Sequence, residues 1–232
     1  MKLEMELIKL LKKKAPIDKL KVEKAVIGVF YAGVKLNNGS GGVALHHVTE
    51  TTQSVCCPKI HYSFPDAGQM SGTPLKKILN FLKGNNLLQR AVGIAAANAV
   101  SSQLIFSGKY KVHENCEASQ LIEFRKSDIV VMIGAFTPYI SNLPRRVREL
   151  HVVERRKTRV CGDKVHLHPE SKAKNVLKKA DVVLITGSAL VNGTMEELIT
   201  YSSGAREIAV IGPTASILPD PLFHGHHAEL QP

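Results

Sequence analysis

Four short runs of apolar, mainly β-branched residues lie in the second half of the chain, and they restrict its fold more than any other feature. IVVMIGAF, LHVVE, VVLITG and IAVIGP begin at residues 129, 150, 182 and 208. Continuous apolar runs of this length are typical of strands that are buried on both faces of a parallel sheet. Helical patterns such as SKAKNVLKKA and TMEELITYS separate them and predict right-handed crossovers. We therefore expect an α/β domain with a Rossmann-like parallel sheet and helices on both of its faces.

The first half of the chain has a different pattern. Leucines at positions 3, 7, 10 and 11 predict an amphipathic helix that ends at Pro16. VIGVFYAGVKL predicts one strand and GVALHHV a second, and the Asn/Gly-rich segment NNGSGG between them predicts a hairpin. Thr73 as N-cap before Pro74 predicts a helix that runs to Lys83. A further helix is expected over 87–104, where small residues predict close packing against a neighbour.

These two patterns predict two domains. The smaller α+β domain is expected over residues 1–115 and the Rossmann-like domain over 116–232. Within the second domain KSDIVVMIG and KADVVLITG share one arrangement, in which an Asp is followed by at least four apolar residues and then a Gly five residues after the run begins. This internal repeat supports a regular alternation of helices and strands.

Composition narrows the class of protein. The chain has 232 residues, of which 44% are hydrophobic, and this excludes an intrinsically disordered chain. We find no unbroken apolar run of the roughly 18 residues that a membrane helix needs, and Glu4 and Glu6 interrupt the apolar stretch that a secretory signal requires. Both observations predict a cytoplasmic protein. The net charge of +11 favours anionic partners, but zinc-finger spacing and basic-aromatic patterns are absent from the sequence, which disfavours nucleic acid.

Glycines end three of the predicted strands, at Gly134, Gly187 and Gly212. In an open parallel sheet, ligands bind beyond the carboxyl ends of the strands. The segment 192–194 leads into a predicted helix, so its backbone N–H groups are expected to hold an anion, with hydroxyls added by Thr186, Ser188 and the threonines at 194 and 214. The alternative is that these segments are ordinary turns with helix caps.

Glu154 follows the second predicted strand and is a second candidate. An acid at this place binds ribose hydroxyls in dinucleotide-binding folds. The first turn reads GAFTPY rather than GxGxxG, which disfavours a nicotinamide or flavin dinucleotide. The alternative role is an ion pair with Arg155, Arg156 or Arg159.

Histidine and cysteine side chains suggest metal ligands at two places. The first set is His46, His47, Cys56, Cys57 and His61, although neighbouring residues of a strand point to opposite faces and CxxC and HxxxH spacings are absent. The second and weaker set is Asp163, His166 and His168, whose two histidines share a face if the segment is extended. A tail with His224, His226 and His227 is expected to bind metal only adventitiously.

The motifs DVVLITGSALVNGTMEELI and VIGPTASILPDPLF, with IGAFTPYI and LHVVER upstream, resemble those of the putative heavy-metal chelation family, a family of unknown function. The resemblance covers nearly the whole chain and implies a domain similar to the N-terminal domain of enolase, followed by a Rossmann-like domain. It also implies that members continue beyond the motif that ends here at Phe223. Carried over to this chain, the ligand-site motifs fall on Gly134, Phe136, Pro138, Glu154, Thr186, Gly187, Asn192, Gly193, Thr194, Gly212, Pro213 and Thr214.

The resemblance and the residues together predict a protein that binds a small anionic ligand and acts in heavy-metal chelation or metal homeostasis. The ligand is expected in the cleft between the two domains. Its cofactor is expected to be a transition metal or a metal complex. We expect no binding to membranes and little binding to nucleic acid. A homodimer is expected because it is the commonest oligomer among soluble proteins. The alternative is a Rossmann-like enzyme that acts on a substrate similar to a nucleotide, a pterin or S-adenosylmethionine.

Overall fold

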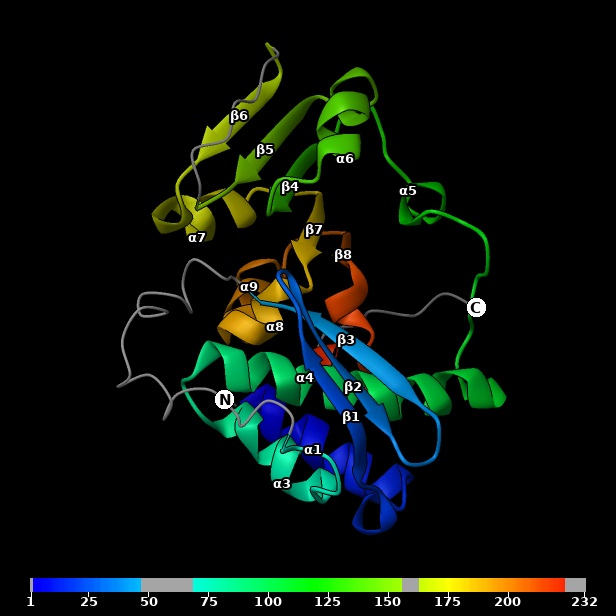
Figure 1. Cartoon of the computed structure of the whole chain (residues 1–232). Coiled ribbons are helices and arrows are strands. Elements are labelled where there is room, and N and C mark those ends of the chain that lie inside the picture. Colours follow the sequence, from blue (N-terminus) through cyan, green and yellow to red (C-terminus); the bar gives the residue numbers. More distant parts are fainter. Residues whose placement is uncertain (1, 47–68, 156–162, 224–232) are drawn as a thin grey trace. The chain divides into compact units, whose positions relative to one another are not determined.

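The computed structural model describes residues 2–46, 69–155 and 163–223 (Figure 1). Contacts within the chain divide these residues into two compact units. Unit 1 comprises the described residues of Met1–Val112, Gly187–Thr194 and Gly212–His224, and unit 2 those of His113–Thr186 and Met195–Ile211. The two short segments of unit 1 that begin at Gly187 and Gly212 thus pack with the first half of the chain, although they lie in its second half.

Unit 1 combines a three-stranded antiparallel sheet, in the order β1-β2-β3, with a long helix and several shorter ones. Its elements are α1 (Lys2–Lys14), η1 (Ile17–Lys19), β1 (Val22–Ile27), β2 (Tyr31–Leu36), β3 (Gly41–Leu45), α3 (Leu75–Leu79), η3 (Asn80–Lys83), α4 (Leu87–Leu104), η4 (Ile105–Lys109), α8 (Ser188–Asn192), η7 (Pro213–Ala215) and α10 (Asp220–Phe223). The predicted first helix and the hairpin around NNGSGG are confirmed, because β2 and β3 pair antiparallel on either side of that turn.

Two local predictions in unit 1 are wrong. The run VIGVFYAGVKL is not one strand, because it turns back on itself where the Gly28 amide donates to the Tyr31 carbonyl at 2.9 Å. Thr73 does not cap the helix that follows, because its carbonyl accepts from the Val22 amide and the cap position is occupied by Pro74. In both places a contact with β1 decides the local conformation.

Helix α4 packs closely against β3, as its small residues predict. A Cβ atom on Gly42 would lie only 2.3 Å from the Ala95 carbonyl oxygen and 2.4 Å from the Ala99 amide nitrogen. By length and composition the stretch Leu87–Lys109 would also be able to cross a membrane, although its apolar residues do not form an unbroken run. A buried core helix satisfies the same criteria, and 61% of the stretch that meets them is buried in the structure.

Unit 2 is built on a parallel sheet in the order β6-β5-β4-β7-β8 (Figure 1). Its elements are α5 (Ala118–Leu121), β4 (Ile129–Ile133), α6 (Thr137–Asn142), η5 (Leu143–Arg145), β5 (Glu149–Val153), β6 (Val165–His168), η6 (Glu170–Lys172), α7 (Ala173–Leu177), β7 (Val182–Thr186), α9 (Met195–Tyr201) and β8 (Glu207–Ile211). The α/β fold class is confirmed, and the four predicted strands are β4, β5, β7 and β8. The edge strand β6 is an addition that its polar sequence, VHLH, did not indicate.

Alternate residues of the central strands point to one face of this sheet and form a core. The strands contribute Val130, Met132, Leu150, Val152, Val182 and Leu184, which are fully buried. Leu143 and Val147 cover them from the segment that joins β4 to β5. Residues 149, 151 and 153 of β5 therefore point to the opposite face.

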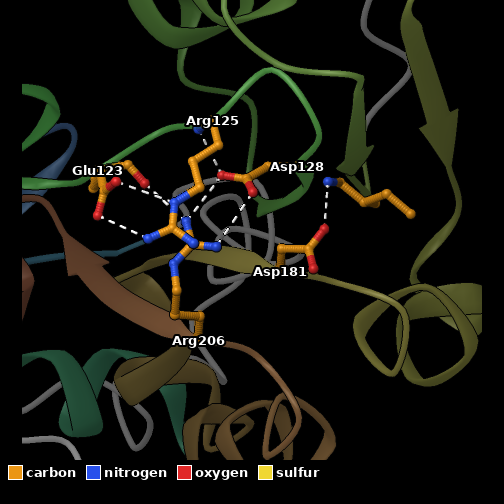
Figure 2. A network of polar contacts seen from close by, with 6 residues as sticks. Glu123, Arg125, Asp128, Asp181 and Arg206 are labelled. Carbon is orange, nitrogen blue, oxygen red and sulfur yellow. Dashed lines mark hydrogen bonds and ion pairs between the residues drawn. The ribbon is translucent and has the colours of Figure 1, made fainter.

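Figure 2 shows the charged network at the amino ends of these strands. Arg206 Nη2 lies 3.0 Å from Asp128 Oδ2, and the Arg125 amide donates to the same carboxylate at 2.8 Å. Asp181, the equivalent residue of the internal repeat, accepts from the Ile129 amide at 2.8 Å. Both aspartates thus hold strand ends together on the edge opposite to the carboxyl ends.

Candidate metal centre

Strands β5 and β6 bring four polar side chains to one face of the parallel sheet. Glu149 and His151 are two residues apart on β5, so their side chains point the same way. The parallel register pairs His151 with His166 and Val153 with His168. Paired residues of neighbouring strands share a face, so both histidines of β6 lie on the same side as Glu149 and His151.

Three of these side chains have the spacing of a metal site. The candidate ligand atoms of Glu149, His151 and His166 all lie within 4.8 Å of one another. His151 Nε2 is 3.0 Å from Glu149 Oε2, and the rings of His151 and His166 have their centroids 4.9 Å apart. Ligand atoms around a tetrahedral zinc ion lie about 3.4 Å apart, so modest side-chain rotation closes the widest pair.

The fourth residue, His168, contacts His151 and not the carboxylate. His168 Nε2 lies 2.9 Å from His151 Nδ1, the ring nitrogen on the side away from the Glu149 contact. The two ring planes differ by only 17° and their centroids are 5.1 Å apart. That separation is close to the N···N distance plus the two ring radii, so the rings lie end to end in a hydrogen bond rather than face to face.

The electrostatics lower the pKa of two groups in this cluster, Glu149 and His168. The hydrogen bond from His151, opposed by desolvation and aided by the charges of His151, Arg148 and His166, lowers the pKa of the Glu149 carboxyl. Burial, and then the neighbouring His151 and His166, lower the pKa of His168. The lowered pKa favours the anionic form of Glu149, which is the form in which a carboxylate binds metal.

The donor set indicates the kind of ion. Two imidazoles and one carboxylate suit zinc, cobalt, nickel or copper better than magnesium or calcium, which prefer oxygen ligands. Three protein ligands also leave at least one coordination position open, as in zinc sites that exchange a water or a substrate. Among these residues His166 is exposed, and Glu149 and His151 are half-buried, so the cluster is reachable from solvent.

The sequence found only part of this cluster. The predicted metal candidates His166 and His168 do share a face of β6. The third predicted candidate, Asp163, is not in the group of close ligand atoms, which contains Glu149 and His151 together with His166. Glu149 and His151 form an E-x-H pattern within a strand. That pattern places two ligands on one face, but only the strand pairing shows which residues lie opposite them.

The other predicted metal set is not assembled within the part of the chain that the structure describes. His46 is buried in unit 1, and its Nε2 lies 2.8 Å from the Gly28 carbonyl oxygen. This contact occupies one ring nitrogen in a backbone hydrogen bond. His47, Cys56, Cys57 and His61 lie outside the described residues, as does the tail with His224, His226 and His227.

The predicted ligand residues of unit 2 do converge at the carboxyl ends of β4, β5 and β7. Gly134 has φ +90°, and a Cβ atom there would lie 3.2 Å from the Thr186 side chain. Glu154 Oε2 accepts from the Ala135 amide at 3.0 Å, which ties the Glu154 side chain to the turn after β4. Phe136 packs against the core at the start of α6, and Pro138 lies in that helix. The proximity of Gly134, Glu154 and Thr186 is therefore structural, whatever they bind.

The remaining predicted residues belong to unit 1, and the amides of two of them are already used. Gly193 has φ +75°, and its N–H donates to the Ala189 carbonyl oxygen, which the Thr194 amide also reaches at 3.0 Å. The expectation that these two amides are free to hold an anion is wrong, because they end helix α8. Asn192 Oδ1 is buried and has no hydrogen-bond partner among the described residues.

A buried arginine explains why the chain turns at this point. Arg90 of α4 donates to the Leu190 and Val191 carbonyl oxygens at 2.8 and 2.6 Å, and to Glu4 Oε1 at 2.7 Å. The Arg90 guanidinium thus binds the last carbonyls of α8, where a cation is favourable. Burial acts to raise the pKa of Glu4, but the bond and charge of Arg90 outweigh it, so that this pKa is lowered.

Gly187 and Thr214 also have packing roles in unit 1. A Cβ atom on Gly187 would lie 2.6 Å from the Ala215 amide nitrogen, so only glycine allows η7 to approach. Thr214 Oγ1 accepts from the Leu45 amide at 2.8 Å, which covers the edge of β3. Gly212 has φ +102°, a backbone conformation that favours glycine.

Pro213 lines a hollow of about 560 Å³ in unit 1. Lys24 and Lys35 of the antiparallel sheet, Asn98 of α4, and Ser216 also line it. The Asn98 amide nitrogen donates to the Thr214 carbonyl oxygen at 3.2 Å, which holds the segment of Pro213 against the helix. A volume of this size is typical of small-molecule sites.

Comparison with known proteins gives matches to both halves of the chain. Two family models match it, over residues 8–101 and 117–228, and both are described as putative heavy-metal chelation. An uncharacterized protein of Methanocaldococcus jannaschii is 26% identical over 155 residues, which are 65% of this chain and 56% of that protein. The chain thus spans a little over half the length of this curated relative.

Solved structures show the same fold. A protein of unknown function from the DUF364 family of Pyrococcus horikoshii matches with a TM-score of 0.71 and 22% identity, and one from Desulfitobacterium hafniense with 0.72 and 19%. Each match covers 96% of this chain and 82% of the other. With both halves of the sequence matched by models of one description, the chain belongs to the family described as putative heavy-metal chelation.

Proposed function

We propose that this protein binds a divalent transition metal through Glu149, His151 and His166. The observation that carries the proposal is the spacing of their ligand atoms, all within 4.8 Å on one face of β5 and β6. The family description names heavy-metal chelation without naming residues. Glu149, His151 and His166 are residues of this chain that would bind such a metal. Two imidazoles and a carboxylate favour an ion of the zinc, cobalt, nickel or copper type.

Metal affinity measured by competition with a chromophoric chelator tests this proposal. The full chain is used with His224, His226 and His227 replaced by alanine, so that the histidine tail does not contribute. We expect binding of Zn²⁺ and Co²⁺ with little binding of Mg²⁺. In this background His166→Ala should weaken binding by more than the roughly 10–100-fold that loss of a supporting residue costs.

His113→Ala is the matched control, because His113 is exposed in the same unit and lies outside the cluster. Glu149→Gln keeps the size of the side chain but removes its charge, and it should also weaken binding. Equal affinity of the His166→Ala and His113→Ala proteins would contradict the proposal.

A second candidate function is the binding of a small anion in the hollow of unit 1. Lys24 and Lys35 line this hollow together with Pro213, one of the predicted ligand residues. Lys35 also pairs with Glu23 at 2.6 Å, on an exposed surface where ion pairs are weak and exchangeable. The two ammonium groups would supply the charge, and the valines beside them an apolar wall.

Thermal unfolding with inorganic phosphate and with citrate as probes tests this second function. We expect either anion to raise the unfolding midpoint of the protein, and Lys24→Met with Lys35→Met to remove the increase. Lys126→Met, in unit 2, is the control for net charge. An unchanged increase in the double variant would reject the hollow as the anion site.

Several expectations stay predictions. They are the cytoplasmic location, the homodimer, the low preference for nucleic acid, the ligand between the two domains, and the alternative of an enzyme acting on a substrate similar to a nucleotide, a pterin or S-adenosylmethionine. The roles of Glu154 and Asn192 in ligand binding stay predictions as well.

A further inference from the structure

We propose that His168 is a positioning residue of the metal centre, which holds the His151 ring in its orientation without binding the metal itself. This inference rests on the proposed function and assigns a role to the fourth side chain of the cluster. It follows from which ring nitrogens face which partners.

The first step is the direction of the hydrogen bonds without metal. An ionised Glu149 carboxylate only accepts, so His151 donates to it from Nε2 across 3.0 Å. A neutral His151 then has an acceptor at Nδ1, and His168 donates to it from Nε2 across 2.9 Å. The chain of contacts therefore runs from His168 through His151 to the carboxylate.

The second step is the effect of a metal ion on the same bonds. If Glu149 and His151 held an ion, His151 would bind it through Nε2, the nitrogen that faces the carboxylate, and its proton would have to lie on Nδ1. Nδ1–H then points at His168 Nε2, which accepts when its own proton lies on Nδ1. Both rings remain neutral, because each moves one proton from Nε2 to Nδ1 by exchange with solvent, and the hydrogen bond reverses direction.

The third step is why His168 is placed to hold the ligand rather than the metal. Its nitrogen faces His151 Nδ1, on the side of that ring away from Glu149. The end-to-end alignment of the two rings, with planes 17° apart, is a geometry that fixes the orientation of the His151 ring and fits either of its tautomers. Metal-binding histidines are commonly held in this way through their other ring nitrogen.

Two variants at one position separate positioning from ligation. His168→Ala removes the acceptor and should lower Zn²⁺ affinity by about 10–100-fold. His168→Gln retains an acceptor in its amide oxygen and should bring affinity back to within a few-fold of the parent. Both are made in the background that lacks the tail histidines, with His113→Ala as the control and far-UV circular dichroism as the check of folding.

The number of imidazole ligands on bound Cu²⁺, counted by electron spin-echo spectroscopy, gives a second readout. It distinguishes a histidine that binds the metal from one that only positions a ligand. We expect two coordinated imidazoles in the parent and in His168→Gln, and one in His166→Ala. Three in the parent and two in His168→Gln would make His168 a ligand and overturn the inference. Unchanged affinity in His168→Ala would overturn it as well. Metal affinity that is unchanged in His166→Ala would instead reject the proposed function, so the two failures are distinguishable.

Discussion

At the residue scale, Asp128 shows how a buried charge is kept ionised. Its side chain is 2% exposed and accepts from Arg206 at 3.0 and 3.3 Å and from the Arg125 amide. Burial acts to raise the pKa of this carboxyl. The hydrogen bonds from Arg206 and the Arg125 backbone, with the charges of both arginines, outweigh burial, so the pKa is lowered.

A lowered pKa in the folded state gives a defined pH dependence. The carboxylate stabilises the fold above its unfolded pKa of about 3.9, and this contribution is lost as pH falls through the folded value. We expect Asp128→Asn to lower the free energy of unfolding at pH 7 by about 1–3 kcal/mol, because hydrogen bonds to a charged, buried group are lost. Its stability should also vary less than that of the parent below about pH 4.

Urea unfolding followed by circular dichroism at a series of pH values checks this expectation. Glu123→Gln is the control, because Glu123 pairs with Arg125 on the surface at 3.1 Å and such pairs contribute little. Parallel pH profiles of the parent and Asp128→Asn would show that the Arg206 contact does not carry the effect.

At the scale of elements, the contact between β3 and α4 organises unit 1. Gly42 allows the strand to approach the helix, and Asn98 then donates from its amide to the Val43 carbonyl oxygen at 2.8 Å. The same side chain reaches the Thr214 carbonyl oxygen, so one helix residue joins β3 to a segment more than 110 residues later in the chain. This junction also forms part of the hollow described above.

Two neighbouring glycines give a matched test of this packing. A Cβ atom on Gly42 would meet the backbone of Ala95 and Ala99 at 2.3 and 2.4 Å, and backbone atoms of a helix cannot rotate away. A Cβ atom on Gly41 would meet only the Val34 carbonyl oxygen, at 3.8 Å. We expect Gly42→Ala to destabilise the fold by about 1–3 kcal/mol or more, and Gly41→Ala to change stability by about 0.5 kcal/mol or less. Denaturant unfolding measures both, and equal stability of the two variants would contradict the close approach.

At the scale of the whole molecule, the chain forms two compact units, and the residues proposed to bind metal lie within unit 2. They come from β5 and from the edge strand β6, which is paired with a single neighbour in the sheet. A bound ion would therefore join the edge strand to its neighbour through side chains as well as through the backbone.

Zinc should for this reason stabilise unit 2. An ion that binds only the folded state at 100 times its dissociation constant adds about 2.7 kcal/mol to stability. We expect slower hydrogen exchange of the β5 and β6 amides with zinc, and a smaller change in β1 to β3 of unit 1. The same protection in His166→Ala would show that zinc acts at another site.

The sequence alone determined the class of fold and much of the element order. Runs such as IVVMIG and VVLITG indicate strands buried on both faces, and helical patterns indicate helices with one buried side. Both can be read from the sequence because each pattern lies within a few neighbouring residues. The glycines that end β4, β7 and β8 were also readable from the sequence. Only the tertiary structure decided which strands pair, and in which register.

That pairing is what places His166 opposite His151 and so beside the local pair of Glu149 and His151, although the two histidines are 15 positions apart along the chain. Side-chain contacts likewise place the Asn192-Gly193 turn at the end of a helix whose Leu190 carbonyl oxygen is bound by Arg90, 100 positions earlier. Contacts between distant segments depend on which apolar faces bury each other. A local pattern carries no information about that partner, so these side chains could be recognised as a site only after folding had brought them together.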